Sequence, residues 1–215
     1  MKLTLKNSTL SAAVVMSLYA AYRVVTKCLS WAGIHLFMQH PVRGEFVGEL
    51  IEVGMLFFVA LFFFALWANR NQLPVLTDKW KNIRMLTSIV IALIVYELIM
   101  QIQMICTYPV SISHIFYNTS WLCPIIFAVA LWLFYAQVKA LPAQSGYYVL
   151  SNYKAALVLC VAILLILSIT ASIILYGIWY HIDSEWLYRW HWRIPLIFKV
   201  AAELCIILSI THNQQ

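Results

Sequence analysis

The chain has 215 residues, of which 64% are hydrophobic and only 10% are charged, whereas a soluble domain carries roughly 25% charged residues. With a mean hydropathy of +0.85, this composition excludes a soluble globular domain and favours a membrane protein built from apolar helices. The 14 Lys and Arg residues outnumber the 8 Asp and Glu residues. They border apolar segments in short connections, so they indicate membrane topology and no direct nucleic-acid binding is expected.

Apolar segments of about 20 residues, long enough to cross a bilayer, recur along the whole chain. We predict six transmembrane helices, at 9–38, 46–69, 83–106, 120–139, 154–181 and 194–211. The connections between them are too short for a soluble domain. We therefore expect residues 1–215 to form a single transmembrane domain, an all-α polytopic membrane bundle.

The first segment has an alternative interpretation as a signal peptide. Lys2 and Lys6 precede an apolar stretch that reaches Tyr22, which is the pattern of a secretory signal. The apolar pattern continues past Arg23 to Met38, as an uncleaved span would, and no clear cleavage motif precedes Tyr22. Cleavage would leave five spans and place the N-terminus outside.

Basic residues that fill or border the connections between the predicted spans gather on one side of the membrane. The eight on this side are Lys2, Lys6, Arg70, Lys79, Lys81, Arg84, Lys139 and Lys154. The opposite side holds Arg43, Arg189 and Arg193, offset by Glu45, Asp183 and Glu185. The positive-inside rule then predicts that both termini lie in the cytoplasm. A bacterial inner (plasma) membrane with a multi-pass chain is the expected location.

Two segments of the chain resemble each other. The run ALFFFALWANRNQLP at 60–74 matches AVALWLFYAQVKALP at 128–142 without a gap at four positions, and Val75-Leu76-Thr77 is answered by Val149-Leu150-Ser151 after a six-residue insertion. This pattern predicts two related helical hairpins in the same orientation. The alternative is chance similarity between apolar sequences of biased composition.

Charged residues inside the predicted spans are costly, at about 2.5–3.5 kcal/mol each. They form one intramembrane charged cluster in our prediction: Arg23, Lys27, Glu49, Glu52, Glu97, Lys199 and Glu203. Within the first, second and sixth spans the charges are three or four residues apart, so each span presents one polar stripe. We expect these stripes and that of the third span to face one another or another subunit. The fourth and fifth spans lack charges and are expected to face mostly lipid.

Two interpretations of the charged stripes remain open. Three cations against four carboxylates could pair and thereby fix helix packing and register. Alternatively, the stripes could line an outward-opening polar cavity for an ion, a proton or a small polar ligand. Glu97 and Glu203 are the deepest carboxylates in this interpretation. Small residues, such as Gly48 and Gly54 in the second span, offer surfaces for close helix contact.

Other motifs favour no enzymatic chemistry. Cys106 and Cys123 flank one outer loop and could form a disulfide, but the five cysteines include no CxxC pair. The segment from Trp179 to Arg193 is rich in aromatic residues and predicts an interfacial helix; His181 and His191 within it do not have the spacing of a metal site. No metal and no cofactor are expected. A redox or metal enzyme built on these cysteines and histidines is the least favoured alternative.

The connection between the second and third spans is the predicted contact for a cytoplasmic partner or for anionic lipid. The residues in this prediction are Arg70, Lys79, Trp80, Lys81 and Arg84. The simpler alternative is that these cations only set topology and touch headgroups.

The absence of catalytic motifs and the unbroken spans predict a non-enzymatic multi-pass inner-membrane subunit. It would sense, anchor or assemble, as a homo-oligomer or with a separate membrane or cytoplasmic partner protein. Bacterial stress, immunity and phage-defence modules offer a class-level analogy. The alternative is a small transporter, channel or membrane-embedded solute-binding subunit with an outward-facing charged cavity.

Overall fold

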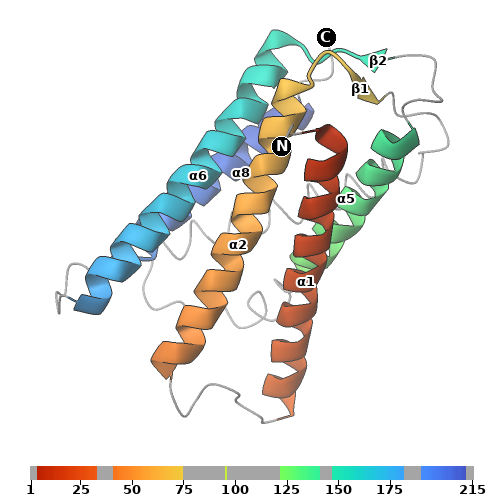
Figure 1. Ribbon diagram of the computed structural model, residues 1–215. Coiled ribbons are helices and arrows are strands. Elements are labelled where there is room, and N and C mark those ends of the chain that lie inside the picture. The colour runs from red at the N-terminus through yellow and green to blue at the C-terminus, as the bar shows by residue number, and fades with distance from the viewer. Residues whose placement is uncertain are drawn as a thin grey trace.

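The structure is a computed structural model, and it describes residues 4–32, 41–74, 95, 122–140, 147–181 and 190–211. This part of the chain is helical apart from one pair of two-residue strands (Figure 1). Its elements are α1 (Leu5–Trp31), α2 (Pro41–Ala68), β1 (Leu73–Pro74), α5 (Leu122–Ala140), β2 (Tyr147–Tyr148), α6 (Asn152–His181) and α8 (Arg193–Thr211). The predicted all-α class is therefore observed in the described residues.

Within the part of the chain that the structure describes, three helical segments are long and apolar enough to cross a membrane: Leu5–Leu29, Leu50–Ala68 and Asn152–Ile178. A shorter apolar helix covers Pro124–Lys139 within α5. The helix α8 coincides with the predicted sixth span, but Lys199 and Glu203 interrupt its apolar character. The predicted third span, 83–106, lies outside the described residues.

The helix boundaries follow from local chemistry. The helix α2 begins at Pro41, five residues before the predicted span, because proline fits the first helical position and the helix continues outside the apolar stretch. The first turns of α5 and α8 contain Pro124 and Pro195 for the same reason. Ser151 precedes α6, and its Oγ accepts a hydrogen bond from the backbone N–H of Lys154 at 3.4 Å, which caps the helix.

Among the described helices, α5 packs on α1, α1 on α2, α2 on α6 and α6 on α8, and α8 lies behind α6 and α2 in the view of Figure 1. The helix α6 thus contacts both α2 and α8. It buries Val161, Ala162 and Leu165, whereas Ile163, Ile166 and other large apolar residues of α6 are exposed. The expectation that this span faces mostly lipid describes the exposed side of α6, but it misses the contacts of α6 with two other helices.

Small side chains bring α1 close to its neighbours. Thr9, Ala12 and Ala13 are completely buried, and Ala20 is nearly so. The hydroxyl of Thr9 donates to the backbone oxygen of Leu5 at 2.7 Å, so its burial leaves no unsatisfied donor. In a lipid environment, helices associate through this kind of close packing rather than through the hydrophobic effect.

The strands β1 and β2 form an antiparallel pair, in which Leu73 lies opposite Tyr148 and Pro74 lies opposite Tyr147. Leu73 and Pro74 end the first of the two similar segments, where they match Leu141 and Pro142. Leu141 and Pro142 lie outside the described residues, and Tyr147 and Tyr148 belong to the six-residue insertion. The strand pair therefore does not test the predicted duplication.

Burial along α2 and α5 follows the same repeat. Ala60 and Ala128 are both buried, at 1% and 6% exposed, whereas Phe64 and Trp132 are both 41% exposed. Two helices whose equivalent positions face the core and the surroundings alike are expected from duplication. Composition alone would produce apolar residues at these positions, but not matching orientation.

Candidate functional site

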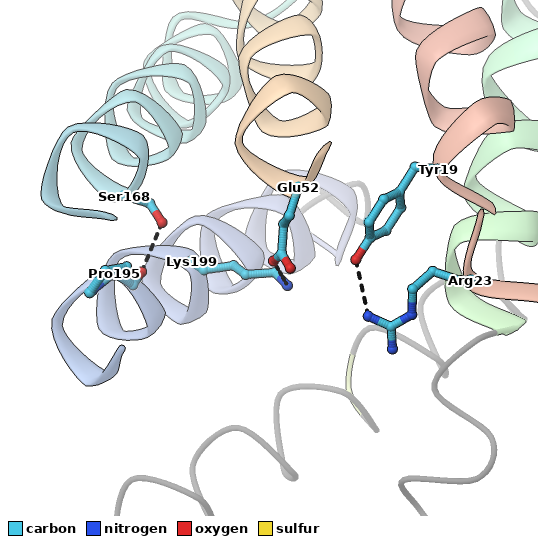
Figure 2. Close-up of polar contacts among 6 residues, drawn as sticks. All are labelled: Tyr19, Arg23, Glu52, Ser168, Pro195 and Lys199. Carbon is cyan, nitrogen blue, oxygen red and sulfur yellow. Dashed lines mark hydrogen bonds and ion pairs between the residues drawn. The ribbon is translucent and has the colours of Figure 1, made fainter. Parts of the chain in front are cut away.

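Charged side chains of α1, α2 and α8 meet in the half of the bundle opposite β1 and β2. Figure 2 shows Tyr19 and Arg23 of α1, Glu52 of α2 and Lys199 of α8 directed toward one region between these helices. We refer to these four residues as the polar cluster. The stripes of three predicted spans therefore contribute to one place in the described structure.

An ion pair links α2 to α8 within the polar cluster. The Lys199 Nζ donates to the Glu52 Oε1 at 3.4 Å, a longer separation than the 2.7–2.9 Å typical of tight charge-assisted hydrogen bonds. The side chains of Lys199 and Glu52 are 22% and 30% exposed. The pair is thus neither fully buried nor fully open, and each charge remains accessible to a third group.

The α1 side of the cluster is organised by Tyr19 and Arg23, one helical turn apart. The Arg23 Nη1 donates to the Tyr19 hydroxyl oxygen at 3.1 Å, and its guanidinium carbon lies 5.8 Å from the centre of the Tyr19 ring. The Tyr19 ring is buried at 6% exposure. Its hydroxyl is directed toward the region that holds Glu52 and Lys199 (Figure 2). Tyr19 therefore holds Arg23 on the side of α1 that faces the α2–α8 ion pair.

Two further contacts hold the helices that carry the cluster. A Cβ added to Gly48 of α2 would lie 3.4 Å from the Tyr22 hydroxyl of α1, which is an ordinary van der Waals distance, so Gly48 faces α1 but a methyl group would also fit there. At Gly54, the other glycine expected to mediate contact, an added Cβ would meet nothing within 4 Å. The Ser168 hydroxyl of α6 donates to the Pro195 carbonyl oxygen in the first turn of α8 at 2.9 Å (Figure 2).

The structure describes the other charged residues of the predicted cluster to different extents. Lys27 lies on α1, one turn beyond Arg23, and Glu203 lies on α8, one turn beyond Lys199; both are half-buried. Glu49 belongs to α2, but only its backbone is described. Glu97 lies outside the described residues, so its expected place beside the other stripes stays a prediction.

The predicted cytoplasmic contact is described only at Arg70. Its guanidinium stacks over the Trp67 ring at 5.3 Å, and its Nη1 donates to the Trp67 backbone oxygen at 3.4 Å. The remaining members of that prediction, Lys79, Trp80, Lys81 and Arg84, lie outside the described residues. Arg70 therefore anchors the end of α2 through an aromatic neighbour.

The structure leaves the predicted disulfide and the aromatic loop largely untested. Cys106 lies outside the described residues, and only the backbone of Cys123, in the first turn of α5, is described. In the aromatic segment, Arg193 stacks on Trp190 and Trp192, at 5.7 and 5.1 Å. The residues described contain no group of three or more His, Cys, Asp or Glu that could hold a metal ion.

Residues missed by the sequence argument complete the cluster. Tyr19 is polar only at its tip and lies in an apolar stretch, but its position four residues before Arg23 puts it on the same helix face. That spacing could have predicted the place of Tyr19 in the cluster. Nothing in the sequence predicts the contact of Ser168, because its partner is a backbone oxygen of a helix far away in the sequence.

The arrangement can neutralise charge between helices and couple their positions. Opposite charges on α2 and α8 attract, and moving α8 relative to α2 separates them. Comparison of the chain with protein-family models, with curated proteins and with solved structures found no match.

Proposed function

We propose that this chain is a non-enzymatic, multi-pass membrane subunit that senses or assembles through the α2–α8 ion pair. The observation that carries the proposal is the contact of Glu52 with Lys199, which joins opposite charges from two helices far apart in sequence. Such a pair fixes the register between two helices, and a change at the pair changes their relative position. Sensing and assembly both require this coupling.

The proposal includes six spans with both termini in the cytoplasm of a bacterial inner membrane. It is supported by where the described cations lie along their helices. Lys6, Arg70, Lys139 and Lys154 all belong to the helix ends or turn on the β1 and β2 side of the bundle. An excess of Lys and Arg marks the cytoplasmic side. The polar cluster then faces the outer leaflet.

The mass of the complex, solubilised gently from native membranes, tests the proposed class of function. We expect a defined homo-oligomer or a stoichiometric protein partner, and we expect the Glu52→Lys variant to shift or abolish that assembly. The Lys139→Gln variant, with its substitution at the other end of the bundle, is the matched control. A monomer holding a metal, a redox cofactor or a water-soluble solute would contradict the proposal.

A solute-binding or transport function is the second candidate, and the partial exposure of Glu52 and Lys199 favours it. An outward-facing cavity predicts that Glu97→Gln and Glu203→Gln leave folding intact but abolish flux or ligand binding. The packing interpretation predicts the reverse, with impaired folding or assembly as the main effect. Thermal unfolding and solute uptake by the same purified variants separate the two functions.

A further inference from the structure

The first residue of α8, Arg193, lies against aromatic rings rather than beside a carboxylate. Its guanidinium carbon is 5.7 Å from the centre of the Trp190 ring and 5.1 Å from that of the Trp192 ring. Its Nε is buried and has no hydrogen-bond partner. Aromatic rings contact the faces of a guanidinium, whereas its N–H groups lie in its plane and are left for hydrogen bonds.

The other arginines with described side chains have acceptors within the chain. Arg23 donates to the Tyr19 hydroxyl oxygen at 3.1 Å, and Arg70, which also lies over a Trp ring, donates to the Trp67 backbone oxygen at 3.4 Å. Arg193 has neither a hydrogen bond nor an ion pair with any residue that the structure describes. A covered N–H without an acceptor is costly and indicates a partner from outside the protein.

The contact between α6 and α8 sets the depth of Arg193 in the membrane. Ser168 donates to the Pro195 carbonyl oxygen at 2.9 Å, so these two residues lie at one level (Figure 2). Ser168 follows Lys154, where the predicted fifth span begins, by fourteen residues, about 21 Å along α6. Arg193 precedes Pro195 by two residues and lies about 24 Å from that membrane surface, in a hydrocarbon layer about 30 Å thick. Its long side chain reaches the opposite headgroups.

The described charges around Arg193 favour an anion. Along α8, Lys199 follows Arg193 by six residues, about 9 Å, whereas the carboxylate of Glu203 follows by ten residues, about 15 Å. The neighbouring helix α6 contains no Asp or Glu. Asp183 and Glu185 precede Arg193 in the chain and lie outside the described residues. At the depth of the headgroups, the anions that surround a membrane protein are lipid phosphates.

We propose that Arg193 binds the phosphodiester group of an anionic phospholipid in the adjacent leaflet. The guanidinium donates paired N–H groups to the phosphate oxygens. Trp190 and Trp192 hold the guanidinium at the interface, where Trp is enriched. A zwitterionic headgroup fits less well, because Arg193 repels its ammonium and the adjacent rings already contact a cation. This site is separate from the α2–α8 ion pair, so it goes beyond the proposed function: the lipid holds the start of α8 at the membrane surface.

The test measures lipid retention by native mass spectrometry of the full chain released from nanodiscs. The nanodiscs contain equal phosphatidylglycerol and phosphatidylcholine with identical acyl chains. We expect the wild-type chain to retain phosphatidylglycerol about fivefold more than phosphatidylcholine, which corresponds to about 1 kcal/mol for one basic residue at the surface. In the Arg193→Gln variant the preference falls to about twofold or less. Equal retention of the two lipids by the wild-type chain overturns the inference.

A matched charge variant separates a site from general attraction to the membrane. Lys139→Gln also removes one cation, from an exposed position at the other end of the bundle, and is expected to leave the preference unchanged. An equal loss in Arg193→Gln and Lys139→Gln overturns the inference. If Arg193→Gln fails to fold, Arg193→Lys keeps the charge and is expected to lower the preference, because an ammonium lacks the planar fork of a guanidinium. An unchanged preference in folded Arg193→Lys overturns the assignment of the site.

Two further measurements exclude other partners. The Asp183→Asn/Glu185→Gln variant removes the acidic residues that precede Arg193, and we expect it to keep or raise the preference for phosphatidylglycerol. A loss equal to that in Arg193→Gln would show that these carboxylates form the site. An excess of inorganic phosphate is compared with sodium chloride of equal ionic strength. Equal retention of phosphatidylglycerol in both salts supports the lipid, whereas loss in phosphate alone assigns the site to a free anion and overturns the inference.

Discussion

The helices α2 and α5 are alike near β1 and β2 and different at their other ends. In the shared part, Ala60 and Ala128 face the core and Phe64 and Trp132 face outward. Beyond it, α2 continues for 28 residues in all and carries Glu52, whereas α5 has 19 residues and no charge before Lys139. In one half of the bundle, which we refer to as the apolar half, α2 and α5 pack alike; in the other half, α2 contributes to the polar cluster and α5 does not.

The comparison separates two sources of structure. Close packing of small and apolar residues holds the apolar half, and the contribution of this packing to stability is spread over many contacts. A few polar contacts hold the other half, so single substitutions there change one defined interaction. We expect substitutions in the first half to affect stability, and substitutions in the second to affect the position of α8 as well.

The largest effect on stability is expected in the apolar half. Ala60→Leu and Ala128→Leu each place three extra carbons in a closed core, so each should lower the free energy of unfolding by about 1–3 kcal/mol. Unfolding by denaturing detergent, followed by circular dichroism, measures the change. If only one of the two substitutions is destabilising, the two positions are not equivalent and the duplication loses its structural support.

A smaller effect is expected at the ion pair. Glu52→Gln removes one charge of the Glu52–Lys199 ion pair, and should lower the free energy of unfolding by about 1–2 kcal/mol, between the values for exposed and buried pairs. The same unfolding measurement applies, with Lys139→Gln as the control because Lys139 is exposed. A change no larger than that of the control would mean that the pair contributes nothing to packing.

Loss of the α6–α8 hydrogen bond should cost less. Ser168→Ala removes the donor to the Pro195 carbonyl oxygen, and bonds of this kind between membrane helices average about 0.6 kcal/mol. Thermal unfolding in one detergent compares this variant with Thr170→Ala, because the Thr170 hydroxyl donates to the Ile166 backbone oxygen within α6 itself. We expect Ser168→Ala to be the less stable of the two; the opposite order would argue against a role in holding α8.

The smallest effect is expected on the outward faces of the repeat. Phe64→Leu alters a side chain that is 41% exposed, and should change the free energy of unfolding by no more than about 0.5 kcal/mol. Thermal unfolding in nanodiscs and in detergent checks the result. A large loss in both environments would show that Phe64 contacts protein rather than lipid.

Much of the helical layout was predictable from hydropathy. The described helices match five predicted spans within a few residues at most ends. The start of α2 at Pro41 was missed because the prediction followed the apolar stretch, whereas a helix continues wherever its backbone bonds are satisfied. The order in which the helices contact one another was not predictable, since apolar sequences do not specify which neighbour each helix contacts.

The polar cluster was predictable in part. Helical spacing placed Arg23, Glu52 and Lys199 on polar stripes, and the cost of charge in a membrane predicted that such stripes meet. Spacing alone did not determine that Lys199 would contact Glu52. That contact depends on how α2, α6 and α8 pack, because α6 contacts both of the other helices although they are far apart in sequence.

The central claim is that the Glu52–Lys199 contact sets the position of α8 relative to α2. Spin labels at the exposed positions Leu50 and Ile197, in a chain whose five cysteines are replaced by alanine, report the separation of these helices by electron paramagnetic resonance. We predict that Glu52→Lys and Lys199→Glu each broaden the distance distribution, and that the exchanged pair Glu52→Lys/Lys199→Glu restores a narrow one. An unchanged distribution in all three variants would contradict the account.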